Sequence, residues 1–241
     1  SVSSNEFRPF IEDLCRLSAR VTLPLFDNPE VITELKEDQT PVTKADRDCE
    51  SMLRERIRSS YPGHGIIGEE FGSDHADAEW TWVLDPIDGT TSFVHGVPLF
   101  TTLIGLMYQG RPVLGAIYQP VLEKLCIGSS EGTYLNANRC QVRGCRNLAD
   151  ATVLASGLAG PQGAVPPEVQ GIIGKARVFR TWGDGWGYMM IARGLADVMI
   201  DGSMKIWDLA AVLPVIEGAG GAAASLRNGD PVSDLSLIAT N

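Results

Sequence analysis

The stretch WVLDPIDGTTSF, residues 82–93, places two aspartates three positions apart at the end of an apolar run. Pro86 stands between Asp85 and Asp88, and Gly89 follows directly. Proline disfavours the α conformation at the residue before it, so the strand is expected to end at Asp85 and the chain to turn sharply there. Two carboxylates held close together repel each other and resist ionisation. The fold must therefore supply something that offsets this repulsion.

The residues that follow predict a helix start with Asp88 as its N-cap. Free backbone N–H groups at such a start favour anions. A divalent cation would offset the repulsion between the aspartates, and a phosphate would bridge that cation to the amides. The alternative is that Asp85 and Asp88 are ordinary turn residues, because aspartate is common in turns.

Composition excludes several classes of function. The 241 residues suffice for one large domain or two small ones, and 44% are hydrophobic, which is enough for a real core. Twenty basic and thirty acidic residues give a formal charge of −10. A surface this negative disfavours nucleic acid and anionic membranes and suits a protein that collects cations.

The cysteine pattern indicates reduced thiols. The five cysteines are scattered, and no pair has the CxxC spacing of a zinc site or redox motif. The first residues lack a cationic segment followed by an apolar one, so no secretory signal is expected. The smoothest apolar segment, AAVLPVIEGAGGAAA, is too short and too interrupted to span a bilayer. A cytoplasmic location is therefore expected.

Apolar periodicity predicts mixed helices and strands, which favours a layered α/β or α+β architecture. The front part, about residues 1–145, is expected to pack a helix pair on an antiparallel sheet. The back part, about 146–241, is expected to alternate strands and helices within the same domain. Thr43 and Asp46 resemble a capping box, and the Pro- and Gly-rich residues 159–171 predict a mobile surface loop. Predicted helices span 5–26, 43–60, 184–193 and 208–219, and predicted strands span 65–70, 81–85, 101–108, 112–119, 124–127, 177–180 and 196–201.

Further acidic residues lie at the ends of apolar segments. Glu69 and Glu70 end the strand-like GIIGEE, and Asp208 in WDLAA opens the most apolar predicted helix. Each has an ordinary alternative, since Glu69 and Glu70 could be surface acids and Asp208 a simple N-cap. Three acidic sites, each beside a buried segment, favour a shared site over coincidence.

Together, GEE, DPIDGTTSF and WDLAA followed by EGAGG resemble the inositol monophosphatase-like family of Mg²⁺-dependent, lithium-sensitive phosphatases. The likeness runs from about residue 5 to 240. It implies a layered αβαβα sugar-phosphatase fold, usually as a homodimer, that acts on small phosphate monoesters.

The resemblance also implies roles for individual residues. Asp46 matches an acid that helps to hold a weakly bound metal, and Glu70 matches one that supports water in the site. Gly89 and Thr90 match phosphate-binding amides, with the Thr90 hydroxyl also directed at the nucleophilic water. The positions that match metal ligands are Glu69, Asp85, the Ile87 carbonyl, Asp88 and Asp208.

An all-oxygen ligand set favours Mg²⁺, for which Mn²⁺ can substitute, over zinc. Two or three ions per site are expected from the resemblance. Bound metals lower the pKa of a water and stabilise the leaving alkoxide, so no histidine or cysteine nucleophile is required. His64 and His75 are expected in loops, and His95 is expected to be structural.

The stretch RTWGDGWGYMMIARGLADVMIDGSMKIWD resembles the histidinol-phosphatase branch, in which G-D-x-x-x-Y precedes an acid seven positions before the WD aspartate. Asp184 and Asp201 would bind the ammonium and imidazole of histidinol, because rim carboxylates suit a cation better than a neutral polyol. Alternatively, Asp184 caps a helix and Asp201 ends a strand. Gly183 and Arg180 are further substrate-binding candidates. The aromatic Trp182, Trp186 and Tyr188 either flank an imidazole or belong to the core.

The first motif favours a different branch, because DGTTSFVHG is closer to inositol-type members, and inositol-1-monophosphatase activity is the alternative. No added basic cluster is present to hold a second phosphate. A non-catalytic, protein-binding regulator is the alternative from another class, since some bacterial relatives bind RNA polymerase. The ligand set is intact, which argues against a loss of catalysis. The motif around Asp184 and the rim carboxylates then favour the metal-dependent hydrolysis of L-histidinol phosphate, a step in histidine biosynthesis.

Overall fold

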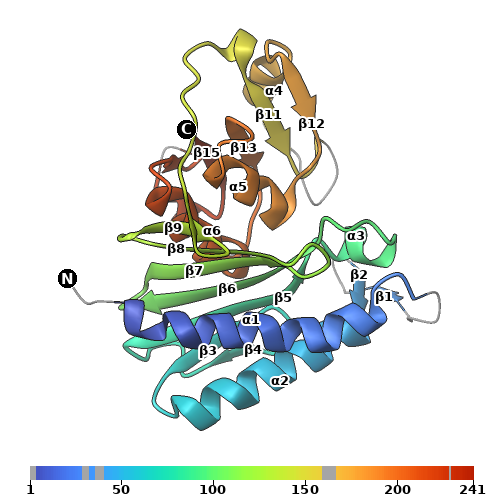
Figure 1. Cartoon of the computed structure of the whole chain (residues 1–241), viewed down its shortest axis with the longest axis vertical. Coiled ribbons are helices and arrows are strands. Elements are labelled where there is room, and N and C mark those ends of the chain that lie inside the picture. Colours follow the sequence, from blue (N-terminus) through green and yellow to red (C-terminus); the bar gives the residue numbers. More distant parts are fainter. Residues whose placement is uncertain (1–3, 29–32, 36–40, 159–166, 228) are drawn as a thin grey trace.

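The computed structural model describes residues 4–28, 33–35, 41–158, 167–227 and 229–241. Figure 1 shows helices and sheets stacked in alternating layers. Helices α1 and α2 cover one face of a large sheet, α5 and α6 lie between this sheet and a smaller one, and α4 packs on the far side. The αβαβα layering expected from the sequence is confirmed.

The larger sheet has eight strands in the order β10-β9-β8-β7-β6-β5-β3-β4. Only β3 and β5 run parallel, and every other neighbouring pair is antiparallel. Its strands are β3 (Gly65–Gly68), β4 (Gly72–Asp74), β5 (Trp80–Asp88), β6 (Thr101–Tyr108), β7 (Arg111–Gln119), β8 (Lys124–Ser129), β9 (Gly132–Leu135) and β10 (Asn138–Cys140).

The two predicted N-terminal helices are present. The first is α1 (Arg8–Thr22), extended by 3₁₀ turns at Asn5–Phe7 and Leu23–Leu25, and the second is α2 (Lys44–Ser60). Thr43 and Asp46 form the predicted capping box, which satisfies N–H groups that a helix start leaves unpaired. The apolar faces of both helices bury against β5–β8 in one cluster. A two-stranded hairpin, β1 (Thr33–Leu35) with β2 (Pro41–Thr43), leads into α2.

Helix α6 (Ile206–Gly218) lies against the opposite face of the large sheet, and a row of glycines lets it approach closely. Gly105, Gly115 and Gly128 stand directly opposite one another on β6, β7 and β8. A Cβ added at Gly115 would lie 1.9 Å from the carbonyl oxygen of Ala211 in α6. The helix backbone therefore sits in a trench that only glycines leave open, which fixes its height above the sheet.

The smaller sheet has the order β12-β11-β13-β15-β14. It is parallel across β12, β11 and β13 and antiparallel at β15 and β14. Its strands are β11 (Thr152–Ala155), β12 (Val178–Arg180), β13 (Val198–Asp201), β14 (Ala222–Ala224) and β15 (Leu237–Thr240). The remaining helices are α3 (Thr90–Val94), α4 (Pro167–Ile173), α5 (Asp184–Ala192) and α7 (Pro231–Asp234), with a 3₁₀ turn at Leu148–Asp150.

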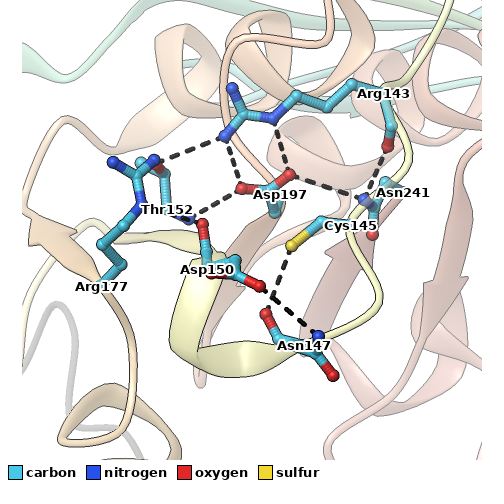
Figure 2. A network of polar contacts seen from close by, with 8 residues as sticks. All are labelled: Arg143, Cys145, Asn147, Asp150, Thr152, Arg177, Asp197 and Asn241. Atoms are coloured by element: carbon cyan, nitrogen blue, oxygen red, sulfur yellow. Dashed lines mark hydrogen bonds and ion pairs between the residues drawn. The ribbon is translucent and has the colours of Figure 1, made fainter.

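A buried carboxylate just before β13 binds both the first residue of β11 and the segment that precedes β11 (Figure 2). Asp197, 1% exposed, accepts hydrogen bonds from Arg143 Nε at 2.7 Å, from Arg143 Nη2 at 2.6 Å and from the Thr152 N–H at 2.7 Å. Asn241 donates to the Arg143 carbonyl at 2.6 Å. The network joins β11, β13 and the end of β15, which come from distant parts of the sequence.

The structure corrects several sequence-based predictions. The chain does not end its strand at Asp85, because β5 continues through Pro86 to Asp88 with an irregular register. Of the predicted loop 159–171, residues 159–166 lie outside the described residues, and Pro167–Ile173 forms helix α4. Short strands such as β9, β11 and β15 were not predicted.

Two predictions about the whole chain can be compared with the structure. All five cysteines are free. Among the described residues, no helix combines the length and the apolar character needed to cross a bilayer.

Candidate metal centre

Three carboxylates from two distant segments meet between the sheets. Asp85 and Asp88 lie on the last residues of β5, and Asp208 lies in the first turn of α6. Each offers a carboxylate oxygen, and these oxygens all lie within 4.8 Å of one another. The convergence expected from the sequence is therefore present.

An irregularity in β5 directs both aspartates to the same point. The strand pairs regularly with β6 up to Asp85, and regular pairing returns at Asp88 opposite Thr101. Asp85 Oδ1 accepts the Ile87 N–H at 3.1 Å, and the Thr102 hydroxyl donates to the Pro86 carbonyl at 2.9 Å. These bonds replace the ladder bonds that the irregular segment loses, so the proline is accommodated without ending the strand.

Asp208 is held by its own helix. Its Oδ2 accepts the Lys205 N–H at 2.7 Å, which makes Lys205 the N-cap and Asp208 the third helical residue. Asp208 is therefore not the N-cap considered from the sequence. Asp88 is not an N-cap either, because α3 begins at Thr90 behind Gly89, whose φ of 80° is left-handed.

The electrostatics of the cluster are those of an anionic site without protein cations. Desolvation, followed by the charges of Glu69, Asp88 and Asp208, raises the pKa of Asp85 well above its ordinary value. Desolvation and the charge of Asp184 do the same to the pKa of Asp88. Desolvation raises the pKa of Asp208 to about 7. Across residues 4–28, 33–35, 41–158, 167–227 and 229–241, no lysine or arginine forms an ion pair with any of these three carboxylates.

The donor set fits a hard divalent cation. Asp88 Oδ2 accepts the Thr101 hydroxyl at 3.1 Å and the Gly185 N–H at 2.5 Å, and Asp208 Oδ2 accepts the Lys205 N–H. No hydrogen bond from the described residues reaches Oδ1 of Asp88 or Oδ1 of Asp208. Within the described residues, Asp88 and Asp208 thus each use one oxygen for the fold and keep the other available, and oxygen-only ligation is what Mg²⁺ and Mn²⁺ prefer.

Glu69 and Glu70 occupy the turn between β3 and β4. The charge of Glu69 contributes to the raised pKa of both Asp85 and Asp208. Glu69 therefore lies beside the cluster, as expected. Its role as a ligand and the role of Glu70 remain predictions.

Asp46, Thr90 and the Ile87 carbonyl form a connected group beside the cluster. Asp46 is 1% exposed, and its Oδ2 accepts the Thr43 N–H at 2.7 Å and the Thr43 hydroxyl at 2.6 Å. The Thr90 hydroxyl lies 3.0 Å from the Ile87 carbonyl and 3.4 Å from Asp46 Oδ1. Desolvation raises the pKa of Asp46 although the bonds from Thr43 oppose it.

A cavity of about 90 Å³ lies beside the cluster and carries two further acids, Asp184 and Asp201. Asp88 and Asp208 line it as well, and no basic side chain lines it in the part of the chain that the structure describes. The Asp184 N–H donates to Ser156 Oγ at 2.8 Å. Gly183 is the N-cap of α5 and passes so close to Ser156 that an added Cβ would lie 2.3 Å from the Ser156 Cα.

Asp201, at the end of β13, is held from two sides. Its Oδ2 accepts the Tyr188 hydroxyl at 2.8 Å, and its Oδ1 accepts the Ser156 N–H at 3.4 Å. Desolvation raises the pKa of Asp201 to about 7, and the bonds from Ser156 and Tyr188 oppose that rise. The pKa of Asp184 is also raised by desolvation.

Of the other candidate residues around Asp184, some line the cavity and others do not. Arg180 does not line the cavity; it is exposed, donates to the Phe179 carbonyl and lies over the Trp182 ring. Trp182 is 42% exposed, and Trp186 packs against the core, so neither lines the cavity. Tyr188 is both a core residue and a cavity residue.

Ser156 and Thr101 were not identified from the sequence. Ser156 follows β11 and contacts both cavity acids, and Thr101 begins β6 and contacts Asp88. No local pattern marks either residue, because each acts through strands paired across long sequence distances.

The histidines do not enter the cluster. His64 accepts the Trp82 indole N–H at 3.1 Å, and His75 is exposed. His95 Nδ1 lies 2.7 Å from the Thr91 carbonyl, which agrees with a structural role.

The layered fold, the carboxylate cluster and a match to a family of phosphatases over most of the chain together identify a phosphoric monoester hydrolase. The model of the inositol monophosphatase family matches residues 5–241, and the chain belongs to this family.

Similar proteins carry different names. The histidinol-phosphatase of Chlorobaculum parvum is 35% identical over 226 residues, which cover 92% of this chain and 86% of that protein. The histidinol-phosphatase of Mycobacterium tuberculosis is 33% identical over 215 residues, covering 86% and 83%. A solved structure of an inositol monophosphatase from Zymomonas mobilis matches with a TM-score of 0.86 at 34% identity, covering 99% of this chain and 94% of that one.

Proposed function

We propose that this protein is a Mg²⁺-dependent phosphomonoesterase that hydrolyses L-histidinol phosphate to L-histidinol and phosphate. The observation that carries the proposal is the cavity beside the carboxylate cluster. Among the described residues, Asp184 and Asp201 line it and no basic residue does, so it suits an organic group that is itself cationic.

In this proposal the chain holds two or three Mg²⁺ ions, or Mn²⁺ in their place, through Glu69, Asp85, Asp88, Asp208 and the Ile87 carbonyl. The raised pKa values of Asp85 and Asp88 support it, because they express a repulsion that a bound cation would relieve. A divalent cation bound there lowers the pKa of a water and neutralises phosphoryl oxygens.

The remaining roles belong to groups around the cluster. The Thr90 hydroxyl, between Asp46 Oδ1 and the Ile87 carbonyl, accepts or passes a proton in the direction of Asp46. Glu70 supports water in the site. The Gly89 and Thr90 amides bind the phosphate, with Gly89 giving the left-handed turn that α3 needs at its start.

Asp184 and Asp201 bind the ammonium and imidazole groups of histidinol. Ser156 contacts both acids and sets their spacing. A hydrogen bond to a charged group contributes about 1.5–3 kcal/mol, which corresponds to about 10–150-fold in affinity. A neutral polyol can also donate hydroxyl hydrogen bonds to these carboxylates, but it brings no positive charge to balance theirs.

Hydrolysis of inositol 1-phosphate is the second candidate. The motif DGTTSFVHG, with Thr91 and His95, favours it, and the Zymomonas mobilis relative is nearly as similar as the Chlorobaculum parvum one. A non-catalytic regulator would show no turnover of any phosphomonoester. The homodimer and the cytoplasmic location also remain predictions, which light scattering and cell fractionation would test.

The deciding experiment compares kcat/KM for histidinol phosphate and inositol 1-phosphate, with Mg²⁺ and with EDTA. We expect Mg²⁺-dependent turnover and a preference for histidinol phosphate. Asp184→Asn should lower kcat/KM for histidinol phosphate about 10–150-fold and change the inositol phosphate value little. Asp77→Asn, which removes an exposed charge, is the control. An unchanged ratio between the two substrates in Asp184→Asn would disprove the cation site.

A further inference from the structure

The turn that carries Glu69 and Glu70 is held in place through its own backbone N–H and carbonyl groups. It connects Gly68 to Gly72, which are paired across β3 and β4. The Glu69 N–H donates to the Leu84 carbonyl of β5 at 3.2 Å. Beyond Glu69, the turn has no further strand to pair with, so its conformation depends on groups from elsewhere.

Among the described residues, two side chains of helix α2 supply such groups. Glu50, 0% exposed, accepts the Glu70 N–H on Oε2 at 2.7 Å and the Phe71 N–H on Oε1 at 3.2 Å. Arg54, 4% exposed, donates to the Gly72 carbonyl and, through Nε, to Glu50 Oε1 at 2.8 Å. Three successive residues of the turn are therefore fastened to one buried ion pair.

Gly68 makes room for this pair. A Cβ at Gly68 would lie 2.0 Å from Glu50 Oε1 and 2.4 Å from its carboxyl carbon. Because both contacts are with the end of a side chain, a residue other than glycine would push the carboxylate away from the turn. The position of the Glu50 carboxylate therefore depends on a glycine at residue 68.

A contribution to folding stability does not by itself explain why a buried ion pair stands here. Two buried charges lose their hydration, and well-packed apolar side chains in their place are often equally stable or more so. An apolar pair could not accept the Glu70 and Phe71 N–H groups or donate to Gly72. The feature that distinguishes Glu50 and Arg54 from an apolar pair is thus the fixed conformation of the turn.

We propose that Glu50 and Arg54 are positioning residues that set the Glu69–Glu70 turn for binding the divalent cation. The inference rests on the proposed function, in which Glu69 is a cation ligand. Loss of the pair weakens cation binding, and because neither residue contacts the reacting atoms, saturating cation restores turnover. Substitutions around metal ligands typically cost 10–100-fold in affinity.

Four variants test this. In Glu50→Gln, an amide N–H₂ group replaces one carboxylate oxygen, and it cannot accept the hydrogen bonds that the backbone N–H groups of the turn or Arg54 donate. The double variant Glu50→Leu with Arg54→Leu removes the anchor without leaving a buried charge. Gly68→Ala displaces the carboxylate and keeps the charge. Asp48→Asn, which removes an exposed acid of the same helix paired with Lys44, is the matched control.

The primary readout is binding of Mn²⁺ without substrate, followed by electron paramagnetic resonance. Phosphate release against Mg²⁺ concentration and the melting temperature in EDTA accompany it. We expect the Mn²⁺ Kd to rise about 10–100-fold in the three turn variants and less than about twofold in Asp48→Asn. At saturating Mg²⁺, kcat should return to within about threefold of wild type, and the double leucine variant should melt near the wild-type temperature.

The proposal is overturned by an unchanged Mn²⁺ Kd in the folded variants, by a kcat that saturating Mg²⁺ does not restore, or by failure of all three turn variants to fold, which would make the pair purely structural. If Glu50→Gln alone fails to fold, the double variant and Gly68→Ala decide. Wild-type protein without Mn²⁺ binding or Mg²⁺-dependent turnover would instead refute the proposed function itself.

Discussion

The row of glycines under α6 leads to a sharp prediction, because it connects the packing of the helix on the sheet to the position of Asp208. In Gly115→Ala, the new Cβ would lie 1.9 Å from the Ala211 carbonyl oxygen. Carbon and oxygen approach to about 3.3 Å in close contacts, so the helix must move by about 1.4 Å. The atoms in the way belong to the helix backbone, so no change of rotamer relieves the contact.

Asp208 lies one turn before Ala211 in the same helix, and a shift of the helix carries Asp208 with it. Metal–ligand distances tolerate only about 0.2 Å of variation. Misplacement of a catalytic group by about 1 Å can cost about 10²-fold in rate. Overpacking should also destabilise the protein by about 1–3 kcal/mol, which for a chain of this size lowers the melting temperature by about 2–12 °C.

The assay measures Mg²⁺ half-saturation, kcat and melting temperature in EDTA for Gly115→Ala and for Gly105→Ala, whose nearest contact is milder at 2.7 Å. Gly63→Ala is the control, because an added Cβ there meets nothing within 4 Å. We expect weaker Mg²⁺ activation in both trench variants, larger for Gly115. A lowered melting temperature with unchanged Mg²⁺ activation would show that the helix does not transmit the shift, and the reasoning would fail.

Two other predictions concern charge. Asp85→Asn should abolish phosphate release. In EDTA at pH 7 the variant should be as stable as wild type or more so, because an aspartate whose pKa is raised in the folded state destabilises that state when ionised. Clear destabilisation in EDTA would mean that Asp85 is structural. Burial lowers the pKa of His64, so the unfolded chain binds more protons below about pH 6.5 and stability should fall as the pH drops, by at most about 1.4 kcal/mol per pH unit. Thermal melts from pH 7 to pH 5 should show a smaller decline in His64→Gln and the wild-type decline in the exposed control His75→Gln.

Features decided by local chemistry could be predicted from the sequence. The capping box of Thr43 and Asp46 needs only residues three apart, and α1 and α2 follow from apolar spacing. The effect of Pro86 was misjudged because it depends on a partner strand: the Thr102 hydroxyl of β6 donates to the Pro86 carbonyl and stabilises the irregular segment. That bond exists only once β6 has paired with β5.

The parts of the site that the sequence did not reveal depend on long-range pairing. β11 has four residues, and its sheet position is set by β12 and β13 and by the buried Asp197. Ser156 gains its importance only because β11 ends between Asp184 and Asp201. A serine after a short strand has no distinctive pattern, so its contacts emerge only when the strand order is known.

The carboxylates of the cluster are tolerated because the fold divides their oxygens between two tasks. Asp88 Oδ2 is bound by Thr101 and by the first turn of α5, and Asp208 Oδ2 is bound by the N-cap of α6. These bonds orient each side chain but cannot cancel its charge, as the raised pKa values show. Orientation therefore comes from backbone and hydroxyl donors, which leaves the charge to be neutralised by a cation that the cluster could bind. A lysine or arginine in the cluster would supply both and would occupy the oxygens that the cation needs.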